Sequence, residues 1–267
     1  MIGLNTESNT SLLQQIQNKQ ESILEKLSSG KRINSAADGA AAQQIIDRLT
    51  TQVEGNRQSI SNSFDGVSLT QAAEGGLSGI NLDVNRIREL SVQSGNGLLS
   101  DSDRQAIQSE VTQLQDNISQ TIEQTQFAGK SLLSSDGNID FQIGANAGQK
   151  ISVATKDVAS GLSDILNVDL STAQGAQDAL VVADDATEFV SSARADLGAT
   201  QNQFESAARN LTQTDVNVAA ARSRIQDTDF AQSASENTAA GILSQTSLAV
   251  QGIANQQQGQ VLTLLNG

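Results

Sequence analysis

Apolar residues recur along most of this chain at intervals of three, four and seven residues, which is the spacing of one face of a helix. The sevenfold spacing is most regular in the second half of the sequence, where its large residues are Val190, Leu197, Phe204, Leu211, Val218 and Ile225. A small residue, Ala or Thr, stands three places after each of the first five. Alternation of large and small residues predicts a coiled-coil seam along which helices approach closely. We interpret these six large residues as a self-assembly seam.

Shorter apolar stripes predict further helices on both sides of this one. The terminal apolar residues are Leu13, Ile16, Ile23 and Leu27 in a first helix, and Ile253, Val261, Leu264 and Leu265 in a last helix. The first helix spans about residues 4–33 and the last about 230–265, with helices between them over about 43–96, 102–128 and 176–221. The stretch 51–94 alone would be ~65 Å long as a helix. A compact globule of this length would be less than ~50 Å across, so the sequence predicts an elongated molecule.

Glycine and polar clusters predict where the helices break. Gly95-Asn96-Gly97 ends one stripe, and Ser102 with Gln105 offers a capping box for the next helix. That helix is expected to end at Phe127-Ala128-Gly129. From about residue 138 to 155, apolar and polar residues alternate on both sides of a glycine-containing loop, which predicts a β-hairpin. Residues 157–175 show little pattern and are interpreted as a short connection. The predicted fold is mainly α, an elongated helical bundle or coiled coil with one small β-hairpin.

Both chain ends are long helices of weak amphipathic character with no evident partner in the middle of the sequence. A helix that buries little apolar surface does not outweigh its conformational entropy when alone. We therefore expect the two terminal helices to pair with each other or with neighbouring copies of the chain.

Composition narrows the classes of function. The chain has 267 residues, with 30 Asp and Glu against 16 Lys and Arg, a formal net charge of −14 and 2% aromatic residues. Few aromatic rings argue against a thick globular core, and the negative charge opposes binding to nucleic acid or to an anionic membrane. No apolar run approaches the ~18 residues of a membrane span, so membrane insertion is not expected. The start, MIGLNTESNT, does not have the pattern of an ordinary secretory signal.

The residue types that most catalytic and metal sites need are missing from the sequence. It holds no His and no Cys, so the usual triads, thiolate nucleophiles and zinc sites cannot form. A Ser/Lys nucleophile stays open, although no motif points to one. The segment DGNIDFQIG (136–144) begins like a calcium loop, but Phe141 and Ala147 stand where that loop needs Gly and Glu. GNGLLS (95–100) lacks the third Gly of a dinucleotide-binding loop. We expect no enzyme, no cofactor and no metal.

Several segments together resemble one protein family, the bacterial flagellins. LEKLSSGKRINSAADGAAAQQIIDRL (24–49), FDGVSLTQAAEGGLSGINLDVNRIRELSVQS (64–94) and QTQFAGKSLL (124–133) are similar to the N-terminal part of that family. RADLGATQNQFESAARNL (194–211), ARSRIQDTDFA (221–231) and the final VLTLL are similar to its C-terminal part. The likeness covers nearly the whole chain. It implies a subunit that polymerises into the flagellar filament for swimming motility.

The resemblance also implies an organisation that periodicity alone does not supply. Residues 1–42 and 222–267 would form an inner coiled-coil domain lining the filament core, and the terminal apolar residues would serve assembly and export. Residues 43–221 would form a rod-like outer domain, with only 157–175 in the place of the large variable domains of long flagellins. The implied location is extracellular, after type III export. The implied partners are further copies of the chain, an export chaperone, and the cap and hook–filament junction proteins.

The stretch VNRIRELSVQSGNG (84–97) carries a small basic and apolar patch. Residues that face each other across a helical hairpin turning near residue 100 sum to about 200, which places Glu110 level with Leu90 and about one turn from Arg86. Arg86, Leu90 and Gln93 share one predicted helix face. As a plain surface ion pair, Arg86 and Glu110 would contribute at most ~1 kcal/mol. By resemblance, Arg86, Leu90 and Glu110 fall where flagellins contact neighbouring subunits and where the host Toll-like flagellin receptor binds. We therefore expect a contact surface at Arg86, Leu90, Gln93 and Glu110.

Two other classes of protein share parts of the pattern. A hook–filament junction protein has similar chain ends, and a coiled-coil adhesin or secreted effector is also elongated but need not polymerise. The segments LSSGKRINSAADGAAA and SRIQDTDFA favour a flagellin over both.

Overall fold

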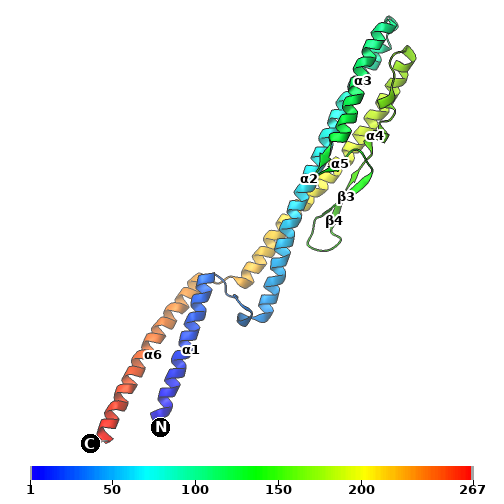
Figure 1. The fold of residues 1–267 in the computed structure, drawn as a ribbon. Helices are drawn as coiled ribbons and strands as arrows, with labels where there is room; N and C mark the ends of the chain where they lie inside the picture. The colour runs from blue at the N-terminus through cyan, green and yellow to red at the C-terminus, as the bar shows by residue number, and fades with distance from the viewer. Residues whose placement is uncertain (1, 266–267) are drawn as a thin grey trace. The chain divides into compact units, whose positions relative to one another are not determined.

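The computed structural model describes residues 2–265 and folds most of them into helices. In chain order, the α-helices of the described residues are α1 (Ile2–Ser29), α2 (Ala40–Ser94), α3 (Asp101–Gln124), α4 (Val158–Gly161), α5 (Ala173–Gln226) and α6 (Phe230–Leu265) (Figure 1). Two compact units result. Unit 1 holds the described residues up to Val53 and from Val216 onward, and unit 2 holds Glu54–Asp215. The mainly helical fold class predicted from periodicity is confirmed.

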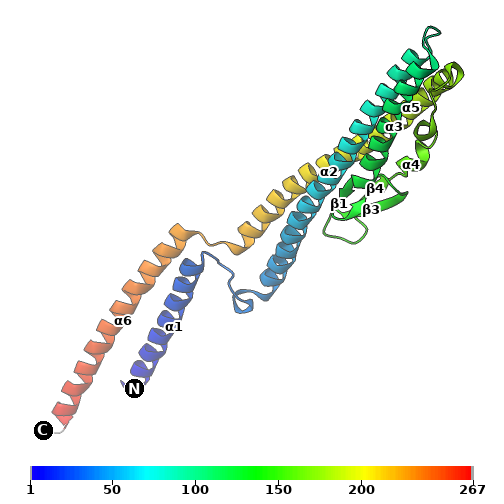
Figure 2. The ribbon, with the colours of Figure 1, turned by 45° about the horizontal axis from the view of Figure 1, so that its top comes forward.

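Unit 2 is a bundle in which α2, α3 and α5 run side by side (Figures 1 and 2). The part of α2 that belongs to it, residues 54–94, is about 60 Å long at 1.5 Å per residue. Its buried stripe steps by threes and fours and consists of Leu69, Ala73, Leu77, Ile80, Val84, Ile87 and Leu90. Apolar residues of α3 and α5 at the same spacing complete one core. The elongated form of this unit follows from aliphatic side chains on long helices, with few aromatic rings to widen the core.

The turn between α2 and α3 is held by a capping box and a buried arginine. The Ser100 hydroxyl accepts a hydrogen bond from the Asp103 N–H, and the Asp103 carboxylate accepts one from the Ser100 N–H. The Arg104 guanidinium donates to the Ser94 carbonyl at 2.6 Å and to the Asn96 carbonyl. The box predicted at Ser102 is therefore wrong by two residues. A carboxylate in the first turn of the helix complements the N-terminal dipole better than an amide does.

Two hairpins follow α3, where the sequence predicted one. The first joins β1 (Gln126–Phe127) to β2 (Lys130–Ser131) through Ala128 and Gly129, whose φ angles are 50° and 77°. Positive φ at both central residues is the requirement of a tight hairpin turn. The segment expected to end the helix is thus a hairpin of its own, and α3 already ends at Gln124.

The second hairpin is the predicted one. β3 (Gly137–Gln142) pairs antiparallel with β4 (Lys150–Thr155), with Ile139 opposite Val153 and Phe141 opposite Ile151. The apolar positions of both strands face the bundle, and Val153 is fully buried. The alternation of the sequence therefore places one face of the hairpin on the helices.

The connection after β4 is more ordered than its sequence suggested. Its apolar residues Val158, Leu162, Ile165 and Leu170 are all buried in the core of unit 2. Side chains of α3 bind its backbone, since Gln115 donates to the Ile165 and Val168 carbonyls and Gln108 accepts from the Leu170 N–H at 2.6 Å. The segment closes the core along α3 instead of merely joining two elements.

In unit 1, α1 and α6 pack against each other, with Ile23 and Ala240 buried between helices. The prediction that the terminal helices pair is confirmed for the described residues. The segment between α1 and α2 also binds the end of α5. The Arg32 N–H donates to the Gln226 carbonyl at 2.6 Å, and the Arg32 guanidinium donates to the Ile225 carbonyl at 2.8 Å. Arg32 thereby caps the C-terminus of α5 with a cation, as the helix dipole favours.

Candidate interaction surface

Arg86 and Glu110 face each other across the α2–α3 pair, as the summing rule predicted. Two guanidinium nitrogens, Nε and Nη2, donate to Glu110 Oε1 at 3.0 and 2.8 Å, and Nη1 donates to Glu89 Oε2 at 3.0 Å. The hydrogen bonds to Glu110 and then to Glu89 raise the pKa of Arg86 above its ordinary value. Both partners stay half exposed to solvent. The group is therefore a fixed, charged surface feature that a partner can bind.

Leu90 does not belong to this surface. Its side chain is 2% exposed and packs in the core with Ile87 and Val84. The prediction of Leu90 as a contact residue is wrong, because its position lies on the edge of the buried stripe that α3 covers. Gln93 does face solvent, as predicted. The exposed apolar residue one helical turn from Arg86 is instead Leu82.

The second arginine of the stretch has a different role that the sequence did not show. Arg88 Nε donates to Asp184 Oδ1 on α5 at 2.6 Å, and this hydrogen bond raises the pKa of Arg88. Arg86 thus pairs with α3 while Arg88 pairs with α5, so the two arginines connect α2 to both neighbours.

The first half of the predicted self-assembly seam lies inside the chain's own core. Val190, Leu197 and Phe204 are buried in unit 2. The Phe204 ring contacts Phe141 edge-on, with centroids 5.3 Å apart and planes at 85°. The prediction that these three residues join separate copies is wrong, because other elements of the same chain already cover them. Leu211, Val218 and Ile225 are half-buried.

The terminal apolar residues divide into covered and uncovered ones. Ile23 is buried, and Leu13, Ile16 and Leu27 are half-buried in the described structure, whereas Ile253 is 58% exposed. The side chains of Val261, Leu264 and Leu265 lie outside the described part of α6. Further exposed apolar side chains on the two helices are Leu12, Leu24, Ile242, Leu243, Leu248 and Val250. Pairing of α1 with α6 therefore leaves much apolar surface on unit 1 uncovered.

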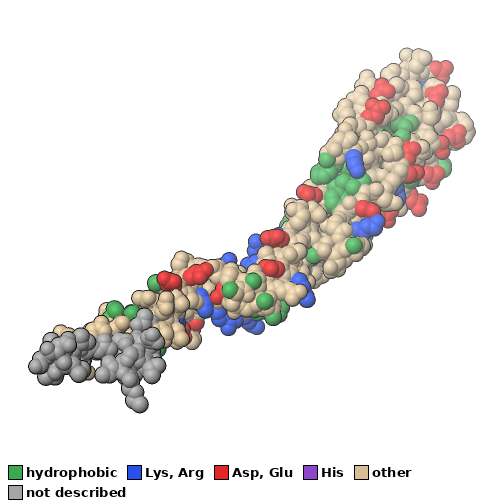
Figure 3. Space-filling model, turned by 60° about the horizontal axis from the view of Figure 1, so that its bottom comes forward, with side chains coloured by type: hydrophobic (Ala, Val, Ile, Leu, Met, Phe, Trp, Pro, Cys, Tyr) green, Lys and Arg blue, Asp and Glu red, His purple; other side chains and the backbone are tan. Residues whose placement is uncertain are grey.

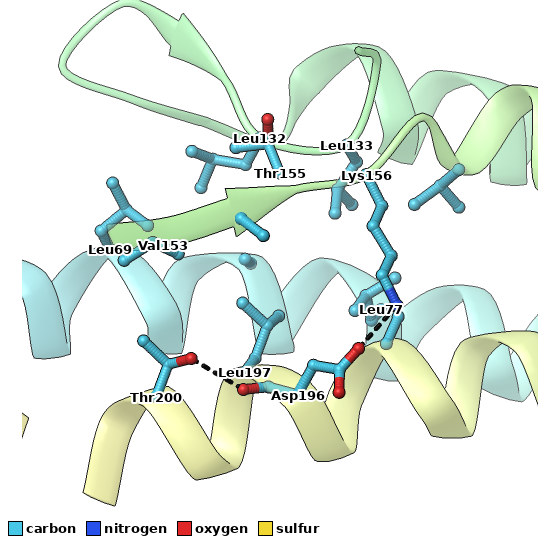
Figure 4. Close-up of a pocket in the computed structure, with 14 residues that line it drawn as sticks. Leu69, Leu77, Leu132, Leu133, Val153, Thr155, Lys156, Asp196, Leu197 and Thr200 are labelled. Atoms are coloured by element: carbon cyan, nitrogen blue, oxygen red, sulfur yellow. Dashed lines mark hydrogen bonds and ion pairs between the residues drawn. The ribbon is translucent and has the colours of Figure 1, made fainter. Parts of the chain in front are cut away.

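A small cavity of about 40 Å³ lies in unit 2 between β4, α2 and α5 (Figure 4). Aliphatic side chains such as Leu69, Leu77 and Leu197 line it, and at one side the Lys156 ammonium pairs with the Asp196 carboxylate at 2.6 Å. The cavity is thus an apolar packing space within the core of unit 2, with one ion pair at its edge. In the part of the chain that the structure describes, no three acidic side chains gather in a way that could hold a metal ion. None of the described helices is long and apolar enough to cross a membrane.

Comparisons with known proteins agree with the fold and with both chain ends. Residues 4–138 match the model of the bacterial flagellin N-terminal helical region, and residues 180–265 match that of the C-terminal helical region. The chain belongs to the bacterial flagellin family. It is 40% identical to a flagellin of Bacillus subtilis over an alignment that covers 91% of each protein. It is also 39% identical to a flagellar filament core protein of Treponema maltophilum, with 91% of each covered.

Solved structures show the same architecture. The crystal structure of Bacillus cereus flagellin superimposes with a TM-score of 0.53 at 26% identity, covering 61% of this chain and 94% of that one. A flagellar hook-associated protein of Vibrio parahaemolyticus gives a TM-score of 0.61 at 14% identity, covering 71% and 100%. The latter shows a shared fold alone, whereas 40% identity over 91% of the chain places it with the flagellins.

Proposed function

We propose that this chain is the structural subunit of a flagellar filament and that its terminal helices carry the polymerisation. The observation that carries the proposal is the apolar surface that α1 and α6 leave exposed on unit 1, whereas the apolar residues that form the core of unit 2 are covered by its own chain. Burial of a Leu or Ile side chain is worth ~1.5–3 kcal/mol. Further copies of the chain would supply that burial, and the function requires no catalysis.

Within the filament, residues 1–42 and 222–267 form the inner domain and 43–221 the outer domain. The division into compact units, after Val53 and before Val216, runs through α2 and α5. The proposed boundaries of the inner and outer domains lie a few helical turns from the boundaries of the compact units. The reason is that the domains are defined by contacts with neighbouring copies, whereas the units are defined by contacts within one chain. The exposed side chains of α6 suit this place, since a helix with uncovered Ile and Leu residues needs apolar neighbours.

The same exposed helix supports the partners expected before assembly. An apolar helix face that is uncovered before polymerisation can bind in the groove of a chaperone. We propose that the export chaperone binds α6. The proposed location is an extracellular filament, reached by export. The remaining proposed partners are a cap protein at the growing end and junction proteins at the base.

Seeded assembly tests the proposed function. Wild-type monomer added to filament fragments is expected to extend them into long tubes in negative stain. Replacing Ile242 and Ile253 by Ser removes two uncovered side chains of α6. Because 1.4 kcal/mol is a factor of ten and each side chain contributes about that or more, the critical concentration should rise about tenfold or more. Val181→Ser, which changes an exposed valine of α5 in unit 2, is the matched control. A wild-type monomer that never extends seeds contradicts the proposal.

Recognition of the monomer by the host Toll-like flagellin receptor is a second part of the proposal. The exposed group of Arg86, Glu89, Gln93 and Glu110 supports it, with Leu82 as an apolar neighbour. Polar side chains fixed by mutual hydrogen bonds offer a partner a preorganised surface.

A receptor reporter assay with monomer tests this part. Arg86→Ala should raise the concentration for half-maximal signalling about fivefold or more, as expected for an interface arginine. Arg88→Ala removes an arginine two residues away that pairs with α5 and should leave signalling within about twofold. Equal effects of both variants would show that the surface at Arg86 is not what the receptor reads.

A further inference from the structure

The turn between α2 and α3 contains an asparagine followed directly by a glycine, Asn96-Gly97, and both residues are exposed. Asn96 Oδ1 accepts a hydrogen bond from the Leu98 N–H at 3.1 Å, as asparagines in turns commonly do. Among the described residues, neither the Gly97 N–H nor the side-chain NH2 group of Asn96 donates a hydrogen bond. The Asn96 side chain is therefore held by its oxygen, while its nitrogen and the next backbone nitrogen are open to solvent.

These contacts arrange the groups that a succinimide ring needs. The Gly97 nitrogen is the atom that can attack Asn96 Cγ, and glycine has no Cβ to crowd that approach. Negative charge then develops on Oδ1, where a backbone N–H that already points at this oxygen stabilises it. The carboxamide nitrogen, which no acceptor holds, is free to leave as ammonia.

We propose that Asn96 deamidates spontaneously in the folded protein, with Gly97 as the nucleophile and the Leu98 N–H as the donor to the oxyanion. The Gly97 nitrogen loses its proton and bonds to Cγ, the Cγ–Nδ2 bond breaks, and ammonia leaves with that proton. Water then opens the succinimide at either carbonyl carbon, giving its hydroxyl to the carbon and a proton to the nitrogen. The products are aspartate and isoaspartate at position 96, each with one more negative charge than asparagine. No oxidant, reductant or enzyme takes part.

Arg104 gives the two products different surroundings. Its guanidinium is 6% exposed and donates to the Ser94 carbonyl at 2.6 Å and to the Asn96 carbonyl at 3.2 Å, both uncharged acceptors. When water attacks the main-chain carbonyl carbon of Asn96, isoaspartate forms and that same carbonyl becomes its carboxylate. A guanidinium binds a carboxylate more strongly than a neutral carbonyl. Figure 3 shows Asp and Glu side chains gathered over the visible face of this end of unit 2, so a cation close to the new charge stabilises it. The turn therefore favours isoaspartate.

Asn34 has the opposite arrangement and serves as a comparison. Its Nδ2 donates to Glu25 Oε1 at 2.7 Å, and the N–H of the next residue, Ser35, donates to Asp38 Oδ2 at 2.9 Å. The leaving nitrogen and the attacking nitrogen are thus both held, although Asn34 and Ser35 are exposed. Asn34 should therefore keep its amide even when a glycine follows it.

Ageing of the monomer in mildly alkaline buffer tests the site. Mass spectrometry of the peptide that contains residue 96 measures the exchange of the amide NH2 for a hydroxyl, and labelling by a protein isoaspartate methyltransferase measures isoaspartate. Ser35→Gly is the matched control, because it gives Asn34 the same following residue as Asn96. In this variant Asn96 should convert at least about tenfold faster than Asn34, which is ~1.4 kcal/mol in activation free energy. Reading each peptide separately also excludes the second Asn-Gly pair, at 266–267, which lies outside the described residues.

Gly97→Ala tests the approach of the attacking nitrogen. An alanine fits the turn, because nothing lies within 4 Å of the Cβ position and Gly97 is not among the described glycines with positive φ. Its Cβ nevertheless crowds the nitrogen beside it, so conversion of Asn96 should slow about tenfold or more. Circular dichroism should show an unchanged helix content.

The same ageing in a denaturing concentration of urea separates the effect of the fold from that of the two residues. Conversion of Asn96 in the folded monomer, with a larger share of isoaspartate than in urea, supports the proposal. An Asn96 that keeps its amide in the folded monomer and loses it in urea would show that the turn protects the site, and the proposal would fall. Equal rates at Asn96 and Asn34 in Ser35→Gly would overturn the role of the free nitrogens, and equal isoaspartate shares with and without urea would overturn that of Arg104. Every readout uses monomer, so the result does not depend on filament assembly.

Discussion

Gly66 shows how one missing side chain sets the packing of unit 2. A Cβ atom built there would lie 2.5 Å from the Phe204 ring, well inside van der Waals contact. The ring is fully buried and touches Phe141 of the hairpin. One glycine thus lets an aromatic ring of α5 lie against the backbone of α2 while the same ring meets β3. In a core with few aromatic residues, this junction joins three elements at one point.

Two glycine substitutions in α2 separate this contact from helix propensity. Gly66→Ala should lower the free energy of unfolding by about 1–3 kcal/mol, because the ring must move in a packed core. Gly75→Ala is the matched control, since nothing lies within 4 Å of its Cβ position. There the alanine should raise the free energy of unfolding by about 0.5–1 kcal/mol, because glycine is the poorer helix former. Urea unfolding followed by circular dichroism measures both, and equal shifts in the same direction would refute the ring contact.

At the scale of elements, periodicity predicted the long helices well and their edges less well. Each of the helices α2, α5 and α6 buries one face, so its apolar residues recur at helical spacing. That spacing is local in the sequence, and it is enough to predict where these helices lie. The cap of α3 was misplaced because Ser100 with Asp103 and Ser102 with Gln105 both fit the spacing of a capping box. The choice depends on Arg104, which binds the end of α2 from the first turn of α3. That contact is tertiary and lies outside any local pattern.

The candidate surface could be predicted only in part for the same reason. Arg86 and Glu110 lie on consecutive helices joined by a short turn, so counting residues brings them together. Arg88 and Asp184 are 96 residues apart, and their register depends on how α5 packs on α2. Leu90 was placed on the surface because three residues at helical spacing share a face. Whether a residue at the edge of that face is buried depends on the neighbouring helix.

At the scale of the whole molecule, hydrogen-bonded carboxylates give the fold a defined response to acid. Donors lower the pKa of five aspartates, which are Asp38, Asp103, Asp140, Asp157 and Asp169. The largest causes include backbone N–H donors, hydroxyl groups such as that of Ser100, and the Lys150 ammonium. Among the described groups whose pKa shifts, only one carboxyl moves the other way, that of Asp83, which burial raises. Protonation of these carboxyl groups therefore mainly lowers the free energy of unfolding.

The direction in which the free energy of unfolding changes with pH follows from a comparison with the unfolded chain, in which an aspartate has a pKa of about 3.9. A carboxyl group whose pKa is lower in the folded state stabilises the fold above that value, and the stabilisation disappears as the pH falls through the folded pKa. The free energy of unfolding should therefore be constant from pH 7 to about pH 5 and fall steadily below it. Urea unfolding of the monomer across this range measures the effect. Asp103→Asn removes one of these groups and should flatten the acid slope. An unfolding free energy that rises below pH 4 would mean that relief of the net charge of −14 outweighs the lost hydrogen bonds.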